Sequence, residues 1–196
     1  MKPSGSQLAL WAVLAAPAVA TVARQATGAI SYGEAIHESG EWAVRLLIAV
    51  LAVTPLRAAF PRAGWMRWVA RRRRDLGVAT FGYALLHLAV YVFLDRALLL
   101  SGVLEDVVKR PFITVGFAAV LLMLPLALTS RRDSVRRMGF AAWSRLHYLV
   151  YPAVLLAGVH FYWAQKKDVS EPVRYALVLA ALLAVRLLWR ARRARG

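Results

Sequence analysis

Three of the four histidines in this sequence lie in long apolar stretches, where an imidazole is unusual. His87 lies within "ATFGYALLHLAVYVFL", residues 79–94, and both His147 and His160 lie within residues 146–165. Neither stretch contains Asp, Glu, Lys or Arg. Because an imidazole buried among apolar groups loses its hydration, a functional partner such as a metal is the first hypothesis. For each histidine taken alone, the alternative is a hydrogen bond to a neighbouring helix.

Depth along the predicted helices pairs His87 with His160. At a rise of about 1.5 Å per residue, His87 lies about 12 Å and His160 about 9 Å below the outer ends of their helices. Two neutral imidazoles at one level match the axial ligands that a haem iron takes from both faces. This ligation fills both axial positions, which favours electron transfer over chemistry at the iron. The sequence has no cysteine, and three imidazoles without a nearby carboxylate argue against a hard divalent-metal site.

The other two histidines are harder to assign. His147 lies about 19 to 20 Å deeper than His160, and about 140° away around an ideal helix unless Pro152 bends it. A second haem at that depth needs a ligand near residues 73–75, where the sequence has only arginine and aspartate. We therefore expect one complete haem site and one incomplete inner site. His37 lies in an expected outer loop and is interpreted as an ordinary solvated side chain.

The elements that must position these residues are membrane-spanning helices. The chain of 196 residues is 60% hydrophobic and carries a formal net charge of +16, a combination that is rare in soluble domains. Three uncharged segments of about 20 residues can each cross a bilayer as a helix, and three further segments carry charges only toward their ends. We predict an all-α integral membrane protein with a six-transmembrane-helix bundle, one domain over residues 1–196. The helices are expected at about 8–23, 42–60, 76–95, 111–130, 145–165 and 172–190.

Basic residues are concentrated at one end of these helices. The N-terminus and residues 57–75, 131–145 and 186–196 hold 18 of the 26 Lys and Arg and two of the ten acidic residues. The positive-inside rule makes this side cytoplasmic, with both termini inside. Because the charge is divided among loops at membrane boundaries, the arginine run at 71–74 indicates topology, and no nucleic-acid partner is expected. The tryptophans and arginines of 61–75 predict an interfacial amphipathic helix.

The first segment has a second interpretation. "MKPSGSQLALWAVLAAPAVAT" has a basic start, an apolar stretch and an A-x-A-like ending at residues 18–20, as a cleavable signal peptide does. Cleavage would leave five spans without reversing any later helix. We expect an uncleaved first helix, an expectation that rests on the resemblance described next.

Five ordered segments carry a resemblance to a known family: "GEWAVRLLIAVLAVTPLR", "YALLHLAVYVFLD", "KRPFITVGFAAVLLMLPLALTS", "WSRLHYLVYPAVLLAGVHFYW" and "KKDVSEP". The chain resembles the haem-binding membrane subunits of the periplasmic methionine-sulfoxide reductase systems (MsrQ, formerly YedZ), within the ferric-reductase-like transmembrane superfamily. The resemblance implies a bacterial inner-membrane protein with heme b and FMN. It also implies electrons from the quinone pool and a partner, a periplasmic molybdenum-containing reductase that repairs oxidised methionines. His87, His147 and His160 fall where this family keeps its haem-associated histidines, but the fourth histidine of two-haem relatives is missing.

Several arginines are candidates for binding cofactor anions. Arg45 and Arg110 could pair with haem propionates at the outer face, and snorkelling to the headgroups is the alternative for both. Arg136, Arg137 and Arg145 lie near His147 and could attract a flavin phosphate, with topology as the alternative role. A flavin or quinol near His147 would bridge the distance from the cytoplasmic side to the outer haem.

The expected activity is electron transfer. The sequence ends soon after the last predicted helix, so the electrons are expected to come from another protein or from a lipid-soluble donor. The catalytic reductase would be a separate protein, and no catalytic residue is assigned to this chain. Two alternatives remain open: a related haem-containing transmembrane reductase with a metal or other acceptor, and a cofactor-free membrane scaffold or transporter.

Overall fold

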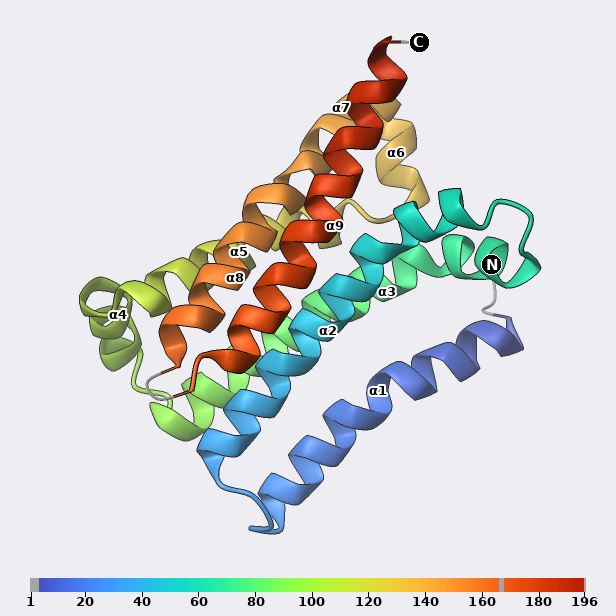
Figure 1. The fold of residues 1–196 in the computed structure, drawn as a ribbon. Helices are drawn as coiled ribbons and strands as arrows, with labels where there is room; N and C mark the ends of the chain where they lie inside the picture. Colours follow the sequence, from blue (N-terminus) through green and yellow to red (C-terminus); the bar gives the residue numbers. More distant parts are fainter. Residues whose placement is uncertain (1–3, 166–167, 196) are drawn as a thin grey trace.

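The computed structural model describes residues 4–165 and 168–195, and every regular element in those two ranges is a helix. The all-α prediction is therefore confirmed for the described chain. The elements are α1 Gly5–Ala26, α2 Tyr32–Ala59, α3 Gly64–Val90, a π-helical turn η1 Tyr91–Asp95, α4 Leu100–Lys109, α5 Pro111–Leu128, α6 Arg132–Met138, α7 Phe140–Leu146, a 3-10 turn η2 His147–Leu149, α8 Val150–Ala164 and α9 Ser170–Arg195 (Figure 1).

Five helical segments of the described chain are long and apolar enough to cross a membrane: Gly5–Ala26, Tyr32–Ala59, Gly64–Asp95, Pro111–Leu128 and Ser170–Trp189. The sixth predicted span, 145–165, is divided between α7, η2 and α8. By itself α8 has 15 residues, which is about 22 Å of helix and less than the roughly 30 Å of a hydrocarbon core. Six spans and the cytoplasmic placement of both termini stay predictions.

The long helices pack as a bundle with α1 at one edge. In Figure 1, α2 and α3 run side by side, α8 lies along α5, and α9 crosses the face that α2 and α8 form. The core repeats at helical spacing along α2, where residues i, i+3 and i+7 point the same way. One cluster joins α2 to α8 and α9, and its buried members are Val44, Leu47, Leu51, Val154, Leu179 and Leu183.

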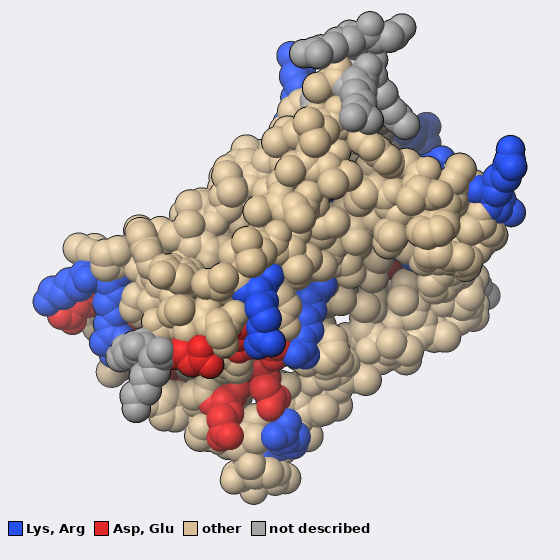
Figure 2. All heavy atoms as spheres, in the orientation of Figure 1, with Lys and Arg blue, Asp and Glu red and all other residues tan. Residues whose placement is uncertain are grey.

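Charge is distributed unevenly between the two ends of the bundle. On the face in Figure 2, acidic side chains gather, together with basic ones, at the end where α2 and α9 begin, while the opposite end shows mainly basic side chains. We call the first of these the outer end and the second the inner end. Many large apolar side chains between the two ends are exposed, including Leu121, Leu128, Leu155 and Leu177. An apolar surface of this extent is typical of helices that face lipid.

The first helix is held to α3 by a tyrosine. The Tyr83 hydroxyl donates to the Leu14 carbonyl at 2.8 Å and accepts from the Ala18 N–H at 2.9 Å. In an uninterrupted helix the Ala18 N–H would donate directly to the Leu14 carbonyl. Pro17 lies between these two residues in α1. Tyr83 thus satisfies the backbone of α1 at its proline, so α1 packs as part of the bundle. That the mature protein retains α1 stays a prediction.

Several predicted boundaries were wrong. The second helix begins at Tyr32, not near residue 42, and Ser31 and Glu34 form a capping box at its start. The predicted interfacial helix at 61–75 is instead the first part of α3, which begins at Gly64. There Asp75 is buried and accepts a hydrogen bond from Gln7 at 3.0 Å. The expected loops at 95–110 and 131–145 contain the short helices α4, α6 and α7.

Candidate functional site

A cavity of about 430 Å³ lies toward the outer end, between α2, α3, α4, α5 and α8. Pockets of a few hundred Å³ with apolar walls and few polar groups are typical of small-molecule and cofactor sites. The walls here are largely apolar, with Leu47, Phe117 and Met123 among them. His87 and His160 also line this cavity, so the two histidines that depth pairs in the sequence share one space.

The two imidazoles come from α3 and α8 and lie beside each other at the cavity. Their ring centroids lie 5.9 Å apart, and the ring planes are inclined by 78°. Metal–imidazole bonds are about 2 Å long, so rings on opposite sides of one metal have centres roughly 6 Å apart. The observed separation is close to that value.

A backbone carbonyl fixes each ring. His87 Nδ1 lies 2.9 Å from the Ile36 carbonyl oxygen on α2, and His160 Nδ1 lies 2.7 Å from the Phe112 carbonyl oxygen on α5. Because a carbonyl can only accept, each Nδ1 carries the proton and donates it. The lone pair of each ring is therefore on Nε2, the tautomer that a metal-ligating histidine needs. Ser39, which is buried, supports this arrangement with its hydroxyl 3.4 Å from His87 Nδ1.

Two glycines leave room for these rings. A Cβ atom at Gly116 on α5 would lie 2.5 Å from Nδ1 of His160, and one at Gly40 on α2 would lie 3.0 Å from Nδ1 of His87. By contrast, a Cβ at Gly158, two residues before His160, would meet no heavy atom within 4 Å. Gly116 is therefore required for the position of His160, and Gly40 allows close packing on His87. Together the cavity, the two tautomers and the glycines fit a haem with two axial imidazoles.

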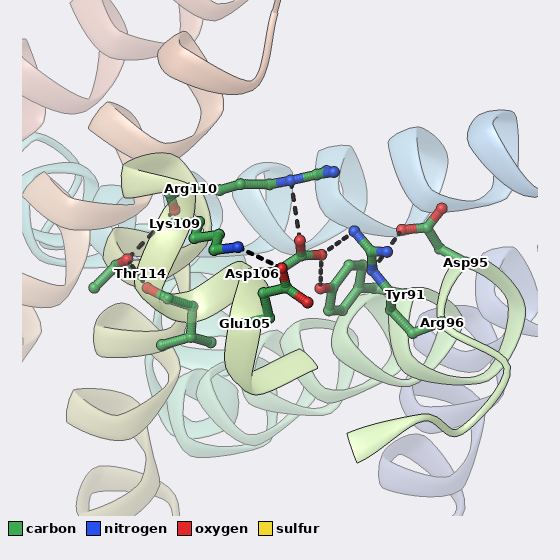
Figure 3. A network of polar contacts seen from close by, with 9 residues as sticks. Tyr91, Asp95, Arg96, Glu105, Asp106, Lys109, Arg110 and Thr114 are labelled. Carbon is green, nitrogen blue, oxygen red and sulfur yellow. Dashed lines mark hydrogen bonds and ion pairs between the residues drawn. The ribbon is translucent and has the colours of Figure 1, made fainter. Parts of the chain in front are cut away.

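A polar network lies beside the cavity (Figure 3), and three of its residues, Tyr91, Asp95 and Arg110, also line it. Asp106 on α4 accepts from the Tyr91 hydroxyl at 2.6 Å, forms an ion pair with Arg96, and lies 3.0 Å from Nε of Arg110. Burial acts to raise the pKa of Asp106, but hydrogen bonds from Tyr91 and Arg96 and the charge of Arg110 hold this pKa below its ordinary value. The network fixes α4 to the end of α3 and the start of α5.

The two candidate propionate partners differ in position. Arg110 lines the cavity, and its side chain is half exposed while its Nε contacts Asp106. Arg45 is not among the described residues that line the cavity. Its guanidinium pairs with Glu41, donates to the Tyr175 hydroxyl at 3.0 Å and lies over the Trp42 ring. Arg110 therefore lies at the cavity and Arg45 outside its described lining, and a propionate contact of either arginine stays a prediction.

His147 is separate from this cavity. It begins the 3-10 turn η2, its ring stacks on Trp143 with centroids 3.9 Å apart, and its Nδ1 lies 3.1 Å from the Trp143 carbonyl oxygen. Trp143 is itself held, since its indole N–H donates to the Thr129 carbonyl at 3.0 Å. The three arginines proposed for a flavin phosphate are exposed on the short helices α6 and α7 that precede His147: Arg136, Arg137 and Arg145.

The interpretation of His37 as merely solvated was incomplete. Its side chain is 40% exposed, but Nε2 lies 3.3 Å from a Glu171 carboxylate oxygen and the ring lines the cavity. Glu41 follows His37 by one helical turn, and both residues belong to α2. The sequence contained the signal, a histidine and a glutamate at i and i+4, but it was missed because residues 24–41 were taken as a loop.

Comparisons with known proteins show the family of this chain. Residues 39–158 match the family of ferric reductase like transmembrane components. A protein of Xanthomonas axonopodis pv. citri is 48% identical over 162 residues, covering 83% of this chain and 72% of its own length. A protein of Ralstonia nicotianae is 42% identical over 188 residues, covering 93% and 85%. Both are named protein-methionine-sulfoxide reductase heme-binding subunit MsrQ. No solved structure matches the chain.

Proposed function

Because this chain belongs to the ferric-reductase-like transmembrane family, and within it to the MsrQ heme-binding subunits, we propose that it is a membrane b-type cytochrome. It takes electrons from the quinone pool and delivers them through haem, with FMN as a further carrier, to a periplasmic molybdenum-containing methionine-sulfoxide reductase. The reductase repairs oxidised periplasmic proteins, and this chain contributes the electron-transfer subunit in the bacterial inner membrane.

The observation that carries the proposal is the pair of His87 and His160 in one cavity, with ring centroids 5.9 Å apart. Their Nε2 atoms would hold the iron from both sides, and the bound haem would supply one-electron redox chemistry. The Ile36 and Phe112 carbonyls hold the rings in the ligating tautomer. The largely apolar walls would favour the apolar faces of a haem, and Arg110 at the cavity would meet a propionate.

The position of the cavity supports delivery to the outer side. It lies toward the end of the bundle where the acidic side chains gather, which is the periplasmic end if the basic end is cytoplasmic. A haem there is near a periplasmic acceptor and far from a cytoplasmic donor. A carrier at the inner end would bridge that gap. His147 stacked on Trp143, with Arg136, Arg137 and Arg145 nearby, is our candidate place for the flavin or the quinone.

Two measurements test this function. Protein purified in detergent after expression in haem-replete cells should contain haem, with reduced-minus-oxidised bands of a bis-histidine b-type cytochrome, and flavin should be quantified on the same sample. Absence of haem in a folded preparation would contradict the electron-transfer proposal. Membranes reduced with a quinol should then reduce a periplasmic methionine-sulfoxide reductase. If the haem is reduced by quinol but this acceptor is not, a different acceptor is indicated.

A further inference from the structure

A second group of ligand-type side chains lies at the outer end, apart from the two cavity histidines that we assign to haem. His37, Glu41 and Glu171 each offer one nitrogen or oxygen atom, and these atoms all lie within 4.8 Å of one another. His37 and Glu41 are one turn apart on the same face of α2. Glu171 approaches them from the first turn of α9, so the group joins two helices that are distant in sequence.

Two carboxylates lie close together in this group. Glu171 lies within hydrogen-bonding reach of Glu41, and two carboxylates this close repel each other unless a proton or a cation lies between them. Arg45 neutralises one of the two, because it pairs with Glu41, to which the Tyr175 hydroxyl also donates at 2.8 Å. Glu171 keeps a carboxylate oxygen 3.3 Å from His37 Nε2, and the charge of Arg174 also acts on it, so a cation would bind where the imidazole and the two carboxylates converge.

We propose that His37, Glu41 and Glu171 bind a divalent transition metal ion, with zinc as the best match. One imidazole and two carboxylates are a ligand set that zinc accepts, and they leave a fourth position for water. Ligand atoms about 2 Å from one zinc lie roughly 3 to 4 Å apart, so small side-chain rotations would complete the site. The side chains are 40%, 13% and 28% exposed, in the order named, so an ion can enter from outside.

This metal would lie at the rim of the cavity, since His37 and Glu41 also line it. By joining α2 to α9 it would fix the outer end of the bundle. Neither His87 nor His160 takes part, so the metal site does not depend on the proposed haem. Zinc bound per polypeptide can therefore be measured whether or not haem is present.

The test is equilibrium dialysis of the detergent-solubilised protein, with any affinity tag removed, against buffered zinc, followed by elemental analysis. The wild-type chain should bind about one zinc, and His37→Ala and Glu171→Gln should each weaken binding by about tenfold or more. The matched control is Glu38→Gln. Glu38 neighbours His37 in sequence but accepts from Thr21 and Arg24 at 3.0 and 2.8 Å on the α1 side, so its variant should bind zinc normally.

Zinc-dependent thermal stabilisation supplies a second readout that guards against misfolding. The melting temperature should rise with zinc in the wild type and in Glu38→Gln but not in His37→Ala, while all variants melt cooperatively without zinc. Absence of saturable zinc binding in the wild type would overturn the proposal. Unchanged binding in His37→Ala would do so as well, as would binding that is lost in His87→Ala but kept in His37→Ala.

Discussion

The outer cavity and the inner end of the bundle each contain a histidine from the same stretch of chain, yet the two rings are held in different ways. His160 donates to a carbonyl of another helix, α5, and its ring lies beside a second imidazole from α3. His147 bonds the carbonyl of Trp143, four residues earlier, and stacks on that residue's own ring. A ring fixed from another helix is oriented by the tertiary fold, whereas a ring fixed from its own helix can form without it. The outer pair is therefore organised for a ligand between helices.

The largest expected effect comes from removing the rings themselves. His87→Ala and His160→Ala should each abolish the haem spectrum, because one axial imidazole does not reproduce the bis-histidine site. His147→Ala should keep at least part of it, since this residue lies outside the cavity lining. Optical spectra of the three purified variants check the prediction. Equal, complete loss in all three would show that the outer and inner histidines are not separate sites.

The glycine beside His160 should give the next largest effect. In Gly116→Ala the new Cβ would lie 2.5 Å from the ring, so the ring or α5 must shift, at a cost of about 1–3 kcal/mol for overpacking. We expect lower haem occupancy or a shifted spectrum. The control is Gly158→Ala, near His160 on α8 but with no atom within 4 Å of the added Cβ. Equal behaviour of the two variants would mean that the glycine does not position the ring. Gly40→Ala, with a 3.0 Å contact, should lie between them.

A glycine at the inner end allows that end to be destabilised while the outer cavity is left intact. Gly139, between α6 and α7, has φ 76° and ψ 149°, a backbone region that is essentially restricted to glycine. Gly139→Ala should therefore destabilise the α6–α7 junction, by about 1–3 kcal/mol. The loss should appear as faster proteolysis or hydrogen exchange of residues 131–146, with the haem spectrum unchanged. Loss of the outer haem in this variant would indicate that the two ends are coupled.

The smallest expected effect is a pH dependence of the outer wall. The pKa of Asp106 is lowered in the folded protein, so its network stabilises the fold above the unfolded pKa of about 3.9 and loses this contribution as the pH falls through the folded value. Thermal melting of the wild type, followed at the haem band, should decline faster below about pH 4 than melting of Asp106→Asn. The difference between the two curves should disappear if the network does not stabilise the cavity wall.

Local signals in the sequence predicted most of the long helices, but they did not predict where α2 and α3 begin. Uncharged apolar runs of about 20 residues led to α3 and α5, and apolar runs with charges toward their ends led to α1, α2 and α9. The start of α2 was missed although Ser31 and Glu34 form a capping box, because the charged residues after them resembled a loop. The early start of α3 was also missed, because Asp75 follows a run of arginines that was interpreted as a segment at the membrane surface. Nothing in that run indicates that Asp75 is buried and bonded to Gln7 of α1. Burial of that carboxylate depends on a helix far away in sequence.

The sequence by itself determined that the chain is helical, with segments apolar enough to cross a membrane, and it predicted how far along its helix each histidine lies. It could do so because the rise per residue is constant along a helix, so a count of residues gives a position along the axis. Only the tertiary structure decided which way the rings point and what holds them. The angle around each helix axis and the choice of neighbouring helix come from packing between distant segments. The Ile36 and Phe112 carbonyls, the space left by Gly116 and the contact of Glu171 with His37 are all of this second kind.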